Sequence, residues 1–320
     1  MAKRNKVKIS PGDVAFRAIL MVILFIYTIS IFFIVGWGFM NSFKEELHFE
    51  TFNALSFPKL PIRPENAKDY NASWAFGNYL TVLKHFNYEK SLSYVSIFSE
   101  NVSAQVNAGI FQMLLNTLYM AIICSAAQVI VCYTTAYLAA KYKFKFSGFL
   151  YGLAIAMMSI PIVGSTPSVI DVLMDLGLYS NYLGMLVMRA SFGGMYFLVF
   201  YAFFEGLPDS YTEAAEIDGA SQMGIYLKII LPMGVKMLGT VVLLLFVHNW
   251  NDYSMAFIYM PTIPTLAFGV YQLAHGGNPM FDGLVYKIAG CMILVVPTTI
   301  LFLCAKDKIM GNISAGGLKG

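Results

Sequence analysis

The feature that most constrains the fold of this 320-residue chain is a series of long apolar stretches. A helix needs about 20 consecutive, mostly apolar residues to cross the hydrocarbon core of a bilayer. Six stretches meet this requirement: Phe16–Met40, Phe111–Ala140, Gly148–Ile170, Tyr182–Phe204, Val235–Met260 and Leu284–Ala305. We therefore predict an all-α integral membrane protein with six transmembrane helices.

The composition agrees with a bilayer as the solvent. Hydrophobic residues make up 58% of the chain, charged residues only 12%, and the mean hydropathy is +0.65. A soluble domain carries about 25% charged residues, and a soluble fold this apolar would expose large apolar patches to water. The net charge of +3 does not indicate a nucleic-acid partner. The four cysteines lie in apolar runs without metal-ligand spacing, which predicts buried apolar side chains.

The basic residues set the predicted orientation, because short loops rich in Lys and Arg stay in the cytoplasm. They cluster before the first stretch, between the second and third, and after the last: Lys3, Arg4, Lys6, Lys8, Arg17, Lys141, Lys143, Lys145, Lys306, Lys308 and Lys319. The segments 171–181 and 261–283 contain none. Both termini are therefore predicted to be cytoplasmic, with a basic N-terminus over 1–15, a six-helix domain over 16–305 and a C-terminal tail over 306–320.

Two regions depart from simple spanning helices. Residues 41–110 form the long external segment, which mixes charges and prolines with apolar residues, so we expect a partly ordered external cap. In the third stretch, Pro161 and Pro167 flank Gly164, and we expect the helix to be bent or broken there.

The cytoplasmic loop over 206–234 has the pattern of a short, capped helix. Ser210 and Glu213 have the spacing of a capping box. Gly219 is the residue type expected for a left-handed C-terminal cap. A second helix is predicted from about Ala220 to Leu231, before Pro232 and the next span. Two neighbouring alanines, Ala214 and Ala215, make one side of the first helix thin, so the helix is predicted to lie in the groove of a partner.

The order of residues in this loop resembles a known family signature. Glu-Ala-Ala, three residues, Gly, nine residues and Ile-x-Leu-Pro follow one another without insertion, which is similar to the signature loop of binding-protein-dependent ABC permeases. The matching residues are Glu213, Ala214, Ala215, Gly219, Ile229, Leu231 and Pro232. The resemblance implies the type I ABC importer permease fold. It also implies that the loop is the coupling helix that docks on the ATPase, a role that falls on Glu213, Ala214, Ala215, Asp218 and Gly219.

Weaker matches elsewhere resemble the carbohydrate branch of that family, the maltose-permease-like members. They are Trp37 with Ser42-Phe43-Lys44, Asn116-Thr117-Leu118, Asn249 to Tyr253, and the tail Ile313 to Gly320, in which Ser314 and Leu318 depart from the usual ending. The resemblance implies a carbohydrate substrate and a bacterial plasma membrane. It also implies a homologous second permease, two ATPase subunits that bind ATP and Mg²⁺, and an external solute-binding protein.

The chain lacks the sequence motifs of an ATPase or of another catalytic site. No Gly-Lys dipeptide occurs, so the G-x-x-x-x-G-K-[ST] phosphate loop is missing, and neither H-E-x-x-H nor G-x-S-x-G is present. We therefore predict a transport subunit without catalytic residues, cofactor or metal. Two alternatives stay open: an ABC permease for amino acids, peptides or an ion, and a secondary transporter or membrane-embedded enzyme. Secondary transport would predict inverted repeats with intramembrane carboxylates.

Polar residues in the second half of the fifth stretch are candidates for a substrate path, because polar groups at membrane depth usually face a cavity or a partner. Aromatic rings beside amide and carboxylate groups suit sugars. The candidates are Asn249, Trp250, Asp252 and Tyr253. Asn249 and Tyr253, four residues apart, would share a helix face. The alternative is that the cluster packs against the partner permease or lies near the external interface.

Three further charged residues lie near the outer ends of the spans. Arg189 is expected to extend its side chain to the membrane interface, with substrate contact or a charge partner as the alternatives. Asp171 and Asp175 are expected in a solvated loop.

Overall fold

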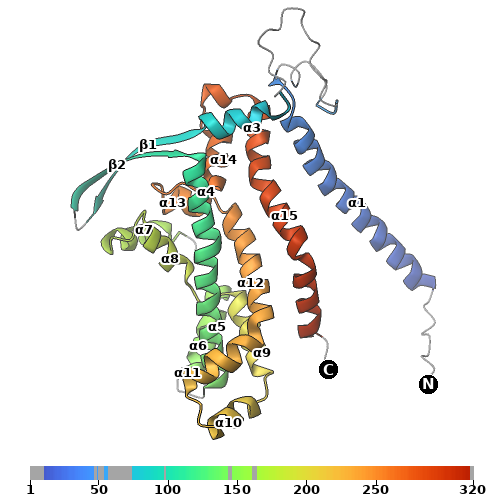
Figure 1. Cartoon of the computed structure of the whole chain (residues 1–320), viewed down its shortest axis with the longest axis vertical. Coiled ribbons are helices and arrows are strands. Elements are labelled where there is room, and N and C mark those ends of the chain that lie inside the picture. The colour runs from blue at the N-terminus through green and yellow to red at the C-terminus, as the bar shows by residue number, and fades with distance from the viewer. Residues whose placement is uncertain are drawn as a thin grey trace, which may run out of the picture. The chain divides into compact units, whose positions relative to one another are not determined.

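The computed structural model describes residues 11–46, 49, 54–56, 74–96, 99–142, 146–160 and 164–317. Figure 1 labels the helices and strands of the chain. The chain divides into two compact units. The first consists of residues 1–82 and 278–293, and the second of residues 83–277 and 294–320.

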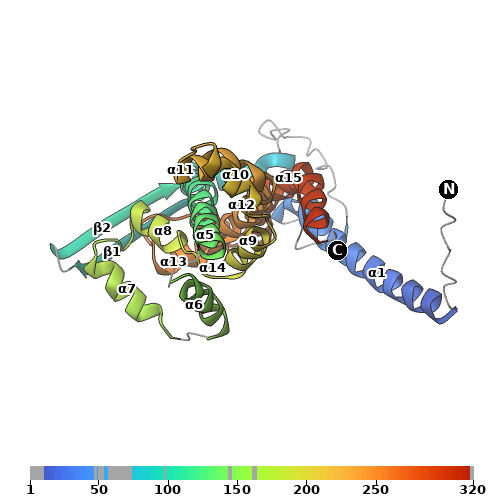
Figure 2. The ribbon, with the colours of Figure 1, turned by 90° about the horizontal axis from the view of Figure 1, so that it is seen from below.

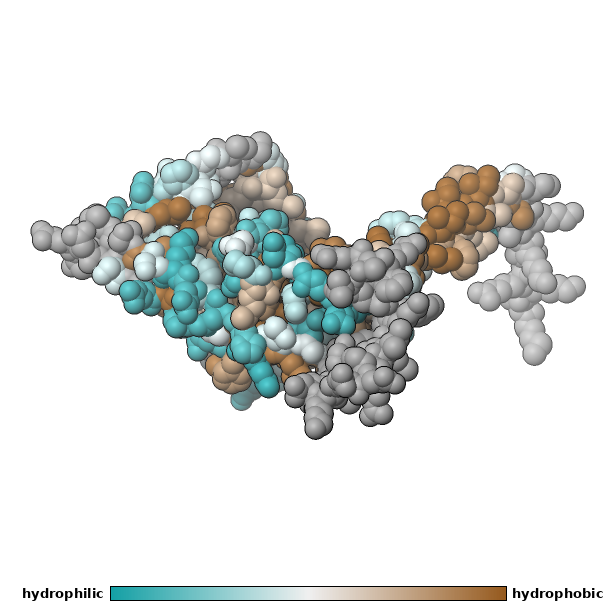
Figure 3. Space-filling view, turned by 90° about the horizontal axis from the view of Figure 1, so that it is seen from above, coloured by the Kyte–Doolittle hydropathy of each residue, from teal (hydrophilic) through white to brown (hydrophobic). Residues whose placement is uncertain are grey.

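Helix α1 (Pro11–Ser42) is the main element of the first unit. Its apolar side chains are exposed along most of its length, and they give the hydrophobic surface seen for this helix in Figure 3. The candidate membrane span Gly12–Ser42 has no buried residue in its most apolar window. A helix that is apolar all round needs lipid or other protein around it. The first predicted span is therefore present as one helix.

The end of α1 is held by polar contacts to α3 (Trp74–His85). The Asn78 amide donates to the carbonyls of Ser42, at 2.8 Å, and Lys44, at 2.7 Å. The Ser42 hydroxyl lies 2.6 Å from the Tyr79 hydroxyl. Lys44 is buried, donates to the Ala54 carbonyl at 3.1 Å, and has its pKa lowered by desolvation. The residues Ser42-Phe43-Lys44 thus fix the exit of the chain from the first helix.

A β-hairpin opens the second unit, formed by β1 (Asn87–Ser96) and β2 (Ser99–Gly109) in antiparallel register. One face is apolar: Tyr88 pairs with Ala108 and both are buried. The Tyr88 ring packs edge-on against Phe268 at 5.2 Å. The prediction of an all-α chain was wrong here, because a pattern of alternating residues over ten positions is weak beside the long apolar stretches. The expected external cap is ordered over this hairpin and α3, while residues 57–73 lie outside the described residues.

Three further helices are long and apolar enough to cross a bilayer, which brings the number of such helices to four among the residues described. Ile110–Lys141 combines α4 (Ile110–Leu118), a π-helix (Tyr119–Cys124) and α5 (Ser125–Lys141). Gln222–Asn251 combines α11 (Gln222–Ile225), a π-helix (Tyr226–Ile230) and α12 (Leu231–Asn251). The fourth is Leu284–Lys306, within α15 (Leu284–Gly317). The chain is thus mostly helical and multi-pass in character.

The third and fourth apolar stretches are each divided into two shorter helices. The third contains nearly all of α6 (Ser147–Ser159) and the first half of α7 (Thr166–Asp175), so a break rather than a bend separates them. Residues 161–163 lie outside the described residues. The fourth contains α8 (Tyr182–Arg189) and α9 (Met195–Glu205), whereas one helix was predicted. Gly194, with φ +107°, takes a backbone conformation that ends the continuity of a helix.

The outer and terminal segments also differ from the prediction. The fifth stretch ends as a helix at Asn251, and the short helices α13 (Ser254–Ile258) and α14 (Leu266–His275) follow. The predicted tail over 306–320 continues the backbone of α15 as far as Gly317. Residues 1–10 and 318–320, in the two predicted cytoplasmic ends, lie outside the described residues.

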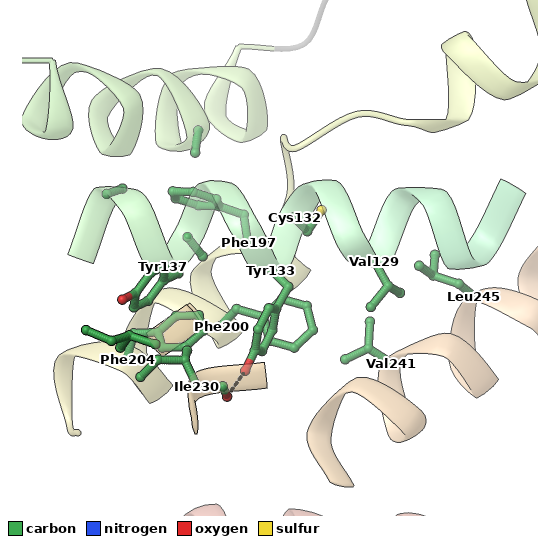
Figure 4. Packing of buried hydrophobic residues seen from close by; sticks show 14 of the residues in the cluster. Val129, Cys132, Tyr133, Tyr137, Phe197, Phe200, Phe204, Ile230, Val241 and Leu245 are labelled. Atoms are coloured by element: carbon green, nitrogen blue, oxygen red, sulfur yellow. Dashed lines mark hydrogen bonds between the residues drawn. The ribbon is translucent and has the colours of Figure 1, made fainter. Parts of the chain in front are cut away.

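The main core of the second unit is built around α5, which lies beside α9 and α12 (Figure 2). The Tyr133 ring packs edge-on against Phe200, at 5.2 Å, and Phe204, at 4.8 Å (Figure 4). Its hydroxyl donates to the Ile230 carbonyl at 2.7 Å. A Cβ atom at Gly234 would lie 2.1 Å from that hydroxyl, so only glycine lets α12 approach Tyr133 this closely. The π-helix ends just before Pro232, which has no N–H to donate.

Candidate functional site: the loop over 206–234 and the polar cluster

The predicted coupling helix is α10 (Ser210–Ile217). Asp209 occupies the N-cap position and makes no side-chain capping bond, so the predicted capping box of Ser210 and Glu213 is wrong. A capping box requires Ser210 at the N-cap position, but Ser210 is already the first residue of the helix. The Asp209 carboxylate instead accepts from the Lys141 ammonium at 2.6 Å. The start of α10 is thus held by another helix.

The end of α10 confirms the expected left-handed cap. Gly219 has φ +76° and nothing lies within 4 Å of its would-be Cβ, so the backbone conformation alone requires glycine. The Ala220 N–H donates to the Ala215 carbonyl at 2.9 Å, and the Gly219 N–H donates to the Glu216 carbonyl at 3.0 Å. These two bonds are those of a Schellman motif. The helix therefore ends at a defined residue.

The two alanines of α10 face in different directions, which corrects the prediction of one thin side. Ala215 is buried in the main hydrophobic core of the second unit. Ala214 is exposed, as are Glu213, Asp218 and Gly219. Ala215 thus seats the helix on its own chain, while its neighbours remain accessible to a partner.

Large apolar side chains are exposed on this loop: Tyr211, Ile217, Met223 and Leu227. Ile217 is the extreme case, with 87% of its surface exposed. We call these four residues the exposed apolar face. Apolar side chains that are exposed in this way are available for contact with another protein. Sequence inspection missed this face because its members are scattered over 17 positions of a loop that is mostly polar.

Two of the candidate path residues are buried and bonded within the chain. Asn249 is 1% exposed, and its amide donates to the Ser125 hydroxyl at 2.7 Å. Trp250 is 4% exposed, and its indole N–H donates to the Leu294 carbonyl at 3.1 Å. Both side chains therefore hold α12 against neighbouring helices in this structure.

The other two candidates lie where α12 ends. Asp252 Oδ1 accepts from the backbone N–H groups of Ser254, at 2.8 Å, and Met255, at 3.3 Å, and so begins α13. Tyr253 is 41% exposed and stacks on Tyr271 with ring centroids 4.7 Å apart and planes 6° apart. We predicted that Asn249 and Tyr253 share one helix face. This is wrong, because α12 ends at Asn251 and Tyr253 lies beyond it.

Arg189 has a charge partner, which sequence inspection had given only as an alternative. Its guanidinium pairs with Asp252 Oδ2, and the two side chains are 17% and 16% exposed. Arg189 is the last residue of α8. The pair therefore joins the end of α8 to the end of α12. Asp171 and Asp175 are exposed on α7, which replaces the solvated loop expected for them.

Long apolar helices, with a capped helix and exposed apolar side chains on the loop between them, define a multi-pass membrane protein. Residues 132–305 match the family described as "Binding-protein-dependent transport system inner membrane component". The match covers more than half of the chain, and the chain belongs to this family. It is thus an ABC importer permease, a transport subunit rather than a catalytic one.

Several characterised or named permeases are similar to the chain. The probable ABC transporter permease protein YurM of Bacillus subtilis is 27% identical over 69% of this chain and 74% of the relative. The sulfoquinovosyl glycerol transport system permease protein SmoH of Agrobacterium fabrum is 26% identical over 65% and 73%. The trehalose transport system permease protein SugB of Mycobacterium tuberculosis is 24% identical over 65% and 76%.

A solved structure shares the fold. A chain of a bacterial ABC transporter involved in the import of the acidic polysaccharide alginate superposes with a TM-score of 0.68 at 19% identity. The match covers 94% of this chain and 99% of that chain. At this identity the likeness establishes the fold alone.

Proposed function

We propose that this permease imports a carbohydrate, forms half of the translocation path together with a homologous second permease, and takes its energy from two separate ATPase subunits. The single observation that carries the coupling is the exposed apolar face on α10 and the helix that follows it, with Ile217 87% exposed. In water such a face would be costly, and the groove of a partner protein would cover it.

Carbohydrate is the substrate class that the relatives favour. The names of SmoH and SugB specify a sulfoquinovosyl glycerol and trehalose, and another relative is an arabinooligosaccharides transport system permease protein of Halalkalibacterium halodurans. The maltose-permease-like matches in the sequence agree with this class. An oligosaccharide also suits the Tyr253 ring, which is 41% exposed, because aromatic rings stack on the C–H face of a sugar.

The proposed orientation follows from the basic residues, with both termini and α10 in the cytoplasm. The apolar stretches cross a bacterial plasma membrane six times, the third and fourth as broken helices. Residues 41–110 and α14 then lie outside, where a solute-binding protein delivers the substrate. The coupling loop over 206–234 and the tail over 306–320 lie on the side of the ATPases.

The proposed mechanism assigns separate tasks to the subunits. The ATPase subunits bind ATP and Mg²⁺ and close, and their grooves move the coupling residues Glu213, Ala214, Asp218 and Gly219 of this chain. Ala215 seats α10 on the membrane domain, so the movement reaches the spans. Among the path candidates, Tyr253 and Asp252 line the route, while Asn249 and Trp250 keep α12 in place. The chain itself then requires no cofactor or metal.

The test uses the complete transporter, purified with its ATPase and reconstituted with its binding protein. Gly219→Pro and Glu213→Lys are expected to lower both transport and substrate-stimulated ATPase activity, while insertion into the membrane is unchanged. The matched control is Lys228→Met, an exposed residue of the same loop, which is expected to leave both rates unchanged. Wild-type stimulation in both test variants would overturn the coupling assignment. A panel of radiolabelled oligosaccharides, amino acids and peptides tests the substrate class.

A further inference from the structure

The cytoplasmic end of α5 contacts the chain on both sides of α10. On the first side, the Lys141 ammonium donates to the Leu207 carbonyl at 2.5 Å and to the Asp209 carboxylate at 2.6 Å. Leu207 follows the end of α9, and Asp209 precedes the start of α10. One side chain of α5 therefore fixes the two residues between which the chain passes from α9 into α10.

The charges of this contact match the two helix ends. The carbonyl end of α9 carries partial negative charge and the N–H end of α10 partial positive charge. The Lys141 cation lies at the former and the Asp209 anion at the latter. The Lys141 side chain is only 13% exposed, whereas that of Asp209 is 71% exposed. The shielded bond to the Leu207 carbonyl is therefore the stronger part of the contact, and the exposed ion pair adds less.

On the second side, a chain of hydrogen bonds returns from α10 to α5. The Tyr142 hydroxyl donates to Gln222 Oε1 at 2.5 Å, and Gln222 Nε2 donates to Glu216 Oε1 at 2.7 Å. Glu216 lies in the last turn of α10 and Gln222 begins α11. A single amide group thus links the end of α10 to the residue that follows α5, because it can accept and donate at the same time.

The two contacts together prevent α10 from turning on one fixed end. A helix held only at its start could pivot when pushed, and most of the displacement would be lost. Held at both ends, α10 moves with α5, which continues through α4 as one span over Ile110–Lys141. A further bond, 2.7 Å between the hydroxyls of Thr134 and Tyr226, joins α5 to the π-helix after α11.

We infer that Lys141 and Gln222 are positioning residues for energy coupling: they hold both ends of α10 on the end of α5, so that movement of the docked ATPase is passed to this span. The inference rests on the proposed function, since it requires that α10 is the docking helix. It assigns to α5 a role that the loop residues alone do not carry.

The experiment measures the number of substrate molecules transported per ATP hydrolysed, in the reconstituted complex with its ATPase and binding protein. Lys141→Met keeps the length of the side chain but loses its charge and donors, and Gln222→Ala removes the amide. For each variant we expect this ratio to fall about tenfold, a change of about 1.4 kcal/mol in coupling free energy. ATPase binding is expected to be retained, because the exposed apolar face is unchanged. Lys141→Arg is expected to restore most of the ratio, and Lys228→Met, the exposed lysine of the same loop, is the control for lost charge.

The outcomes separate this inference from the proposed function. A wild-type ratio in both Lys141→Met and Gln222→Ala would overturn the inference while leaving α10 as the docking helix. Loss of the ATPase from the complex in these variants, but not in Lys228→Met, would also overturn it, since the residues would then serve docking rather than transmission. If the wild-type chain binds no ATPase through α10, the proposed function fails first, and the inference with it.

Discussion

Arg189 and Asp252 form an ion pair although they lie 63 positions apart, each at the end of a different helix. The other carboxylate oxygen of Asp252 accepts from the Ser254 N–H at the start of α13. The Asp252 side chain therefore stabilises the break in the fifth apolar stretch and also links this stretch to the fourth. The Arg189 Nε atom is buried without a partner. The ion pair with Asp252 therefore offsets most of the desolvation penalty of the partly buried Arg189 guanidinium.

Removing one partner of this pair should destabilise the protein far more than removing both charges. Arg189→Met leaves the Asp252 carboxylate, whose side chain is only 16% exposed, without its cation, for which we expect a loss of about 3 kcal/mol. The double variant Arg189→Met/Asp252→Asn should recover much of it, because asparagine can still accept from the Ser254 N–H. The thermal unfolding of the purified permease complex measures the difference.

The matched control for that prediction is the exposed pair of Lys287 and Asp282, whose charged atoms are 3.3 Å apart. Lys287→Met should change stability by less than about 1 kcal/mol, as is usual for exposed pairs. Equal losses in Arg189→Met and in the double variant would show that the pairing itself is unimportant.

A methyl group at position 234 should be costly, while the same group at position 239 should not. The Cβ of Gly234→Ala would meet the Tyr133 ring and hydroxyl, the nearest atom at 2.1 Å, so α12 must shift. We expect a loss of about 1–3 kcal/mol, typical of an overpacked core. Gly239→Ala, on the same helix, meets nothing within 4 Å and should be neutral or slightly stabilising. Unfolding in detergent, followed for both variants, tests the pair.

Cysteine labelling should distinguish the two faces of α10. In a chain whose Cys124, Cys132, Cys291 and Cys304 are replaced by alanine, Ile217→Cys should react rapidly with a polar maleimide, since this position is 87% exposed. Ala215→Cys, two residues away and buried, should react slowly. Addition of the ATPase should protect position 217.

The same background tests the orientation. Asp175→Cys, at the other side of the proposed bilayer, should react only from outside the cell, and Ile217→Cys only from the cytoplasm. Labelling of both from one side of sealed vesicles would contradict the topology.

Removal of the Tyr253 ring should weaken transport without uncoupling the ATPase. Tyr253→Ala loses the face proposed to stack on a sugar, which is worth about 1 kcal/mol, so KM for transport should rise about fivefold. Tyr253→Phe keeps the ring and should retain a wild-type KM. Uptake of the labelled substrate over a range of concentrations measures both. An equal effect of the two substitutions would point to the hydroxyl group instead of the ring.

Much of the architecture could be predicted from the residues, because bilayer thickness and helix rise fix the length of a span. The signal is strongest for uninterrupted helices such as Ile110–Lys141. The hydropathy signal did not reveal the break after Arg189, where five residues separate α8 from α9. Hydropathy averaged over a window is still high there, because the residues on both sides are apolar. The hairpin at 87–109 was missed for a related reason, since two strands of alternating residues have little mean hydropathy.

The site was predictable where it is local. The left-handed Gly219 follows from residue type and position alone. Contacts between residues far apart in the chain could not be predicted. No sequence pattern pairs Lys141 with Leu207 or Arg189 with Asp252, because each contact depends on how the helices pack. The same holds for Ala214 and Ala215, whose opposite surroundings are set by the angle at which α10 meets the core.

The opposite surroundings of these two alanines have a consequence for how such transporters can diverge. The residue that seats α10 on the core of the second unit differs from the exposed residues that the proposed function assigns to the ATPase, although they adjoin in the chain. Under the proposed function, substitutions at Ala214 or Ile217 can therefore adapt the chain to a different ATPase subunit without any change in the membrane-spanning helices. A single ATPase could in this way be shared among, or exchanged between, importers with unrelated cargo.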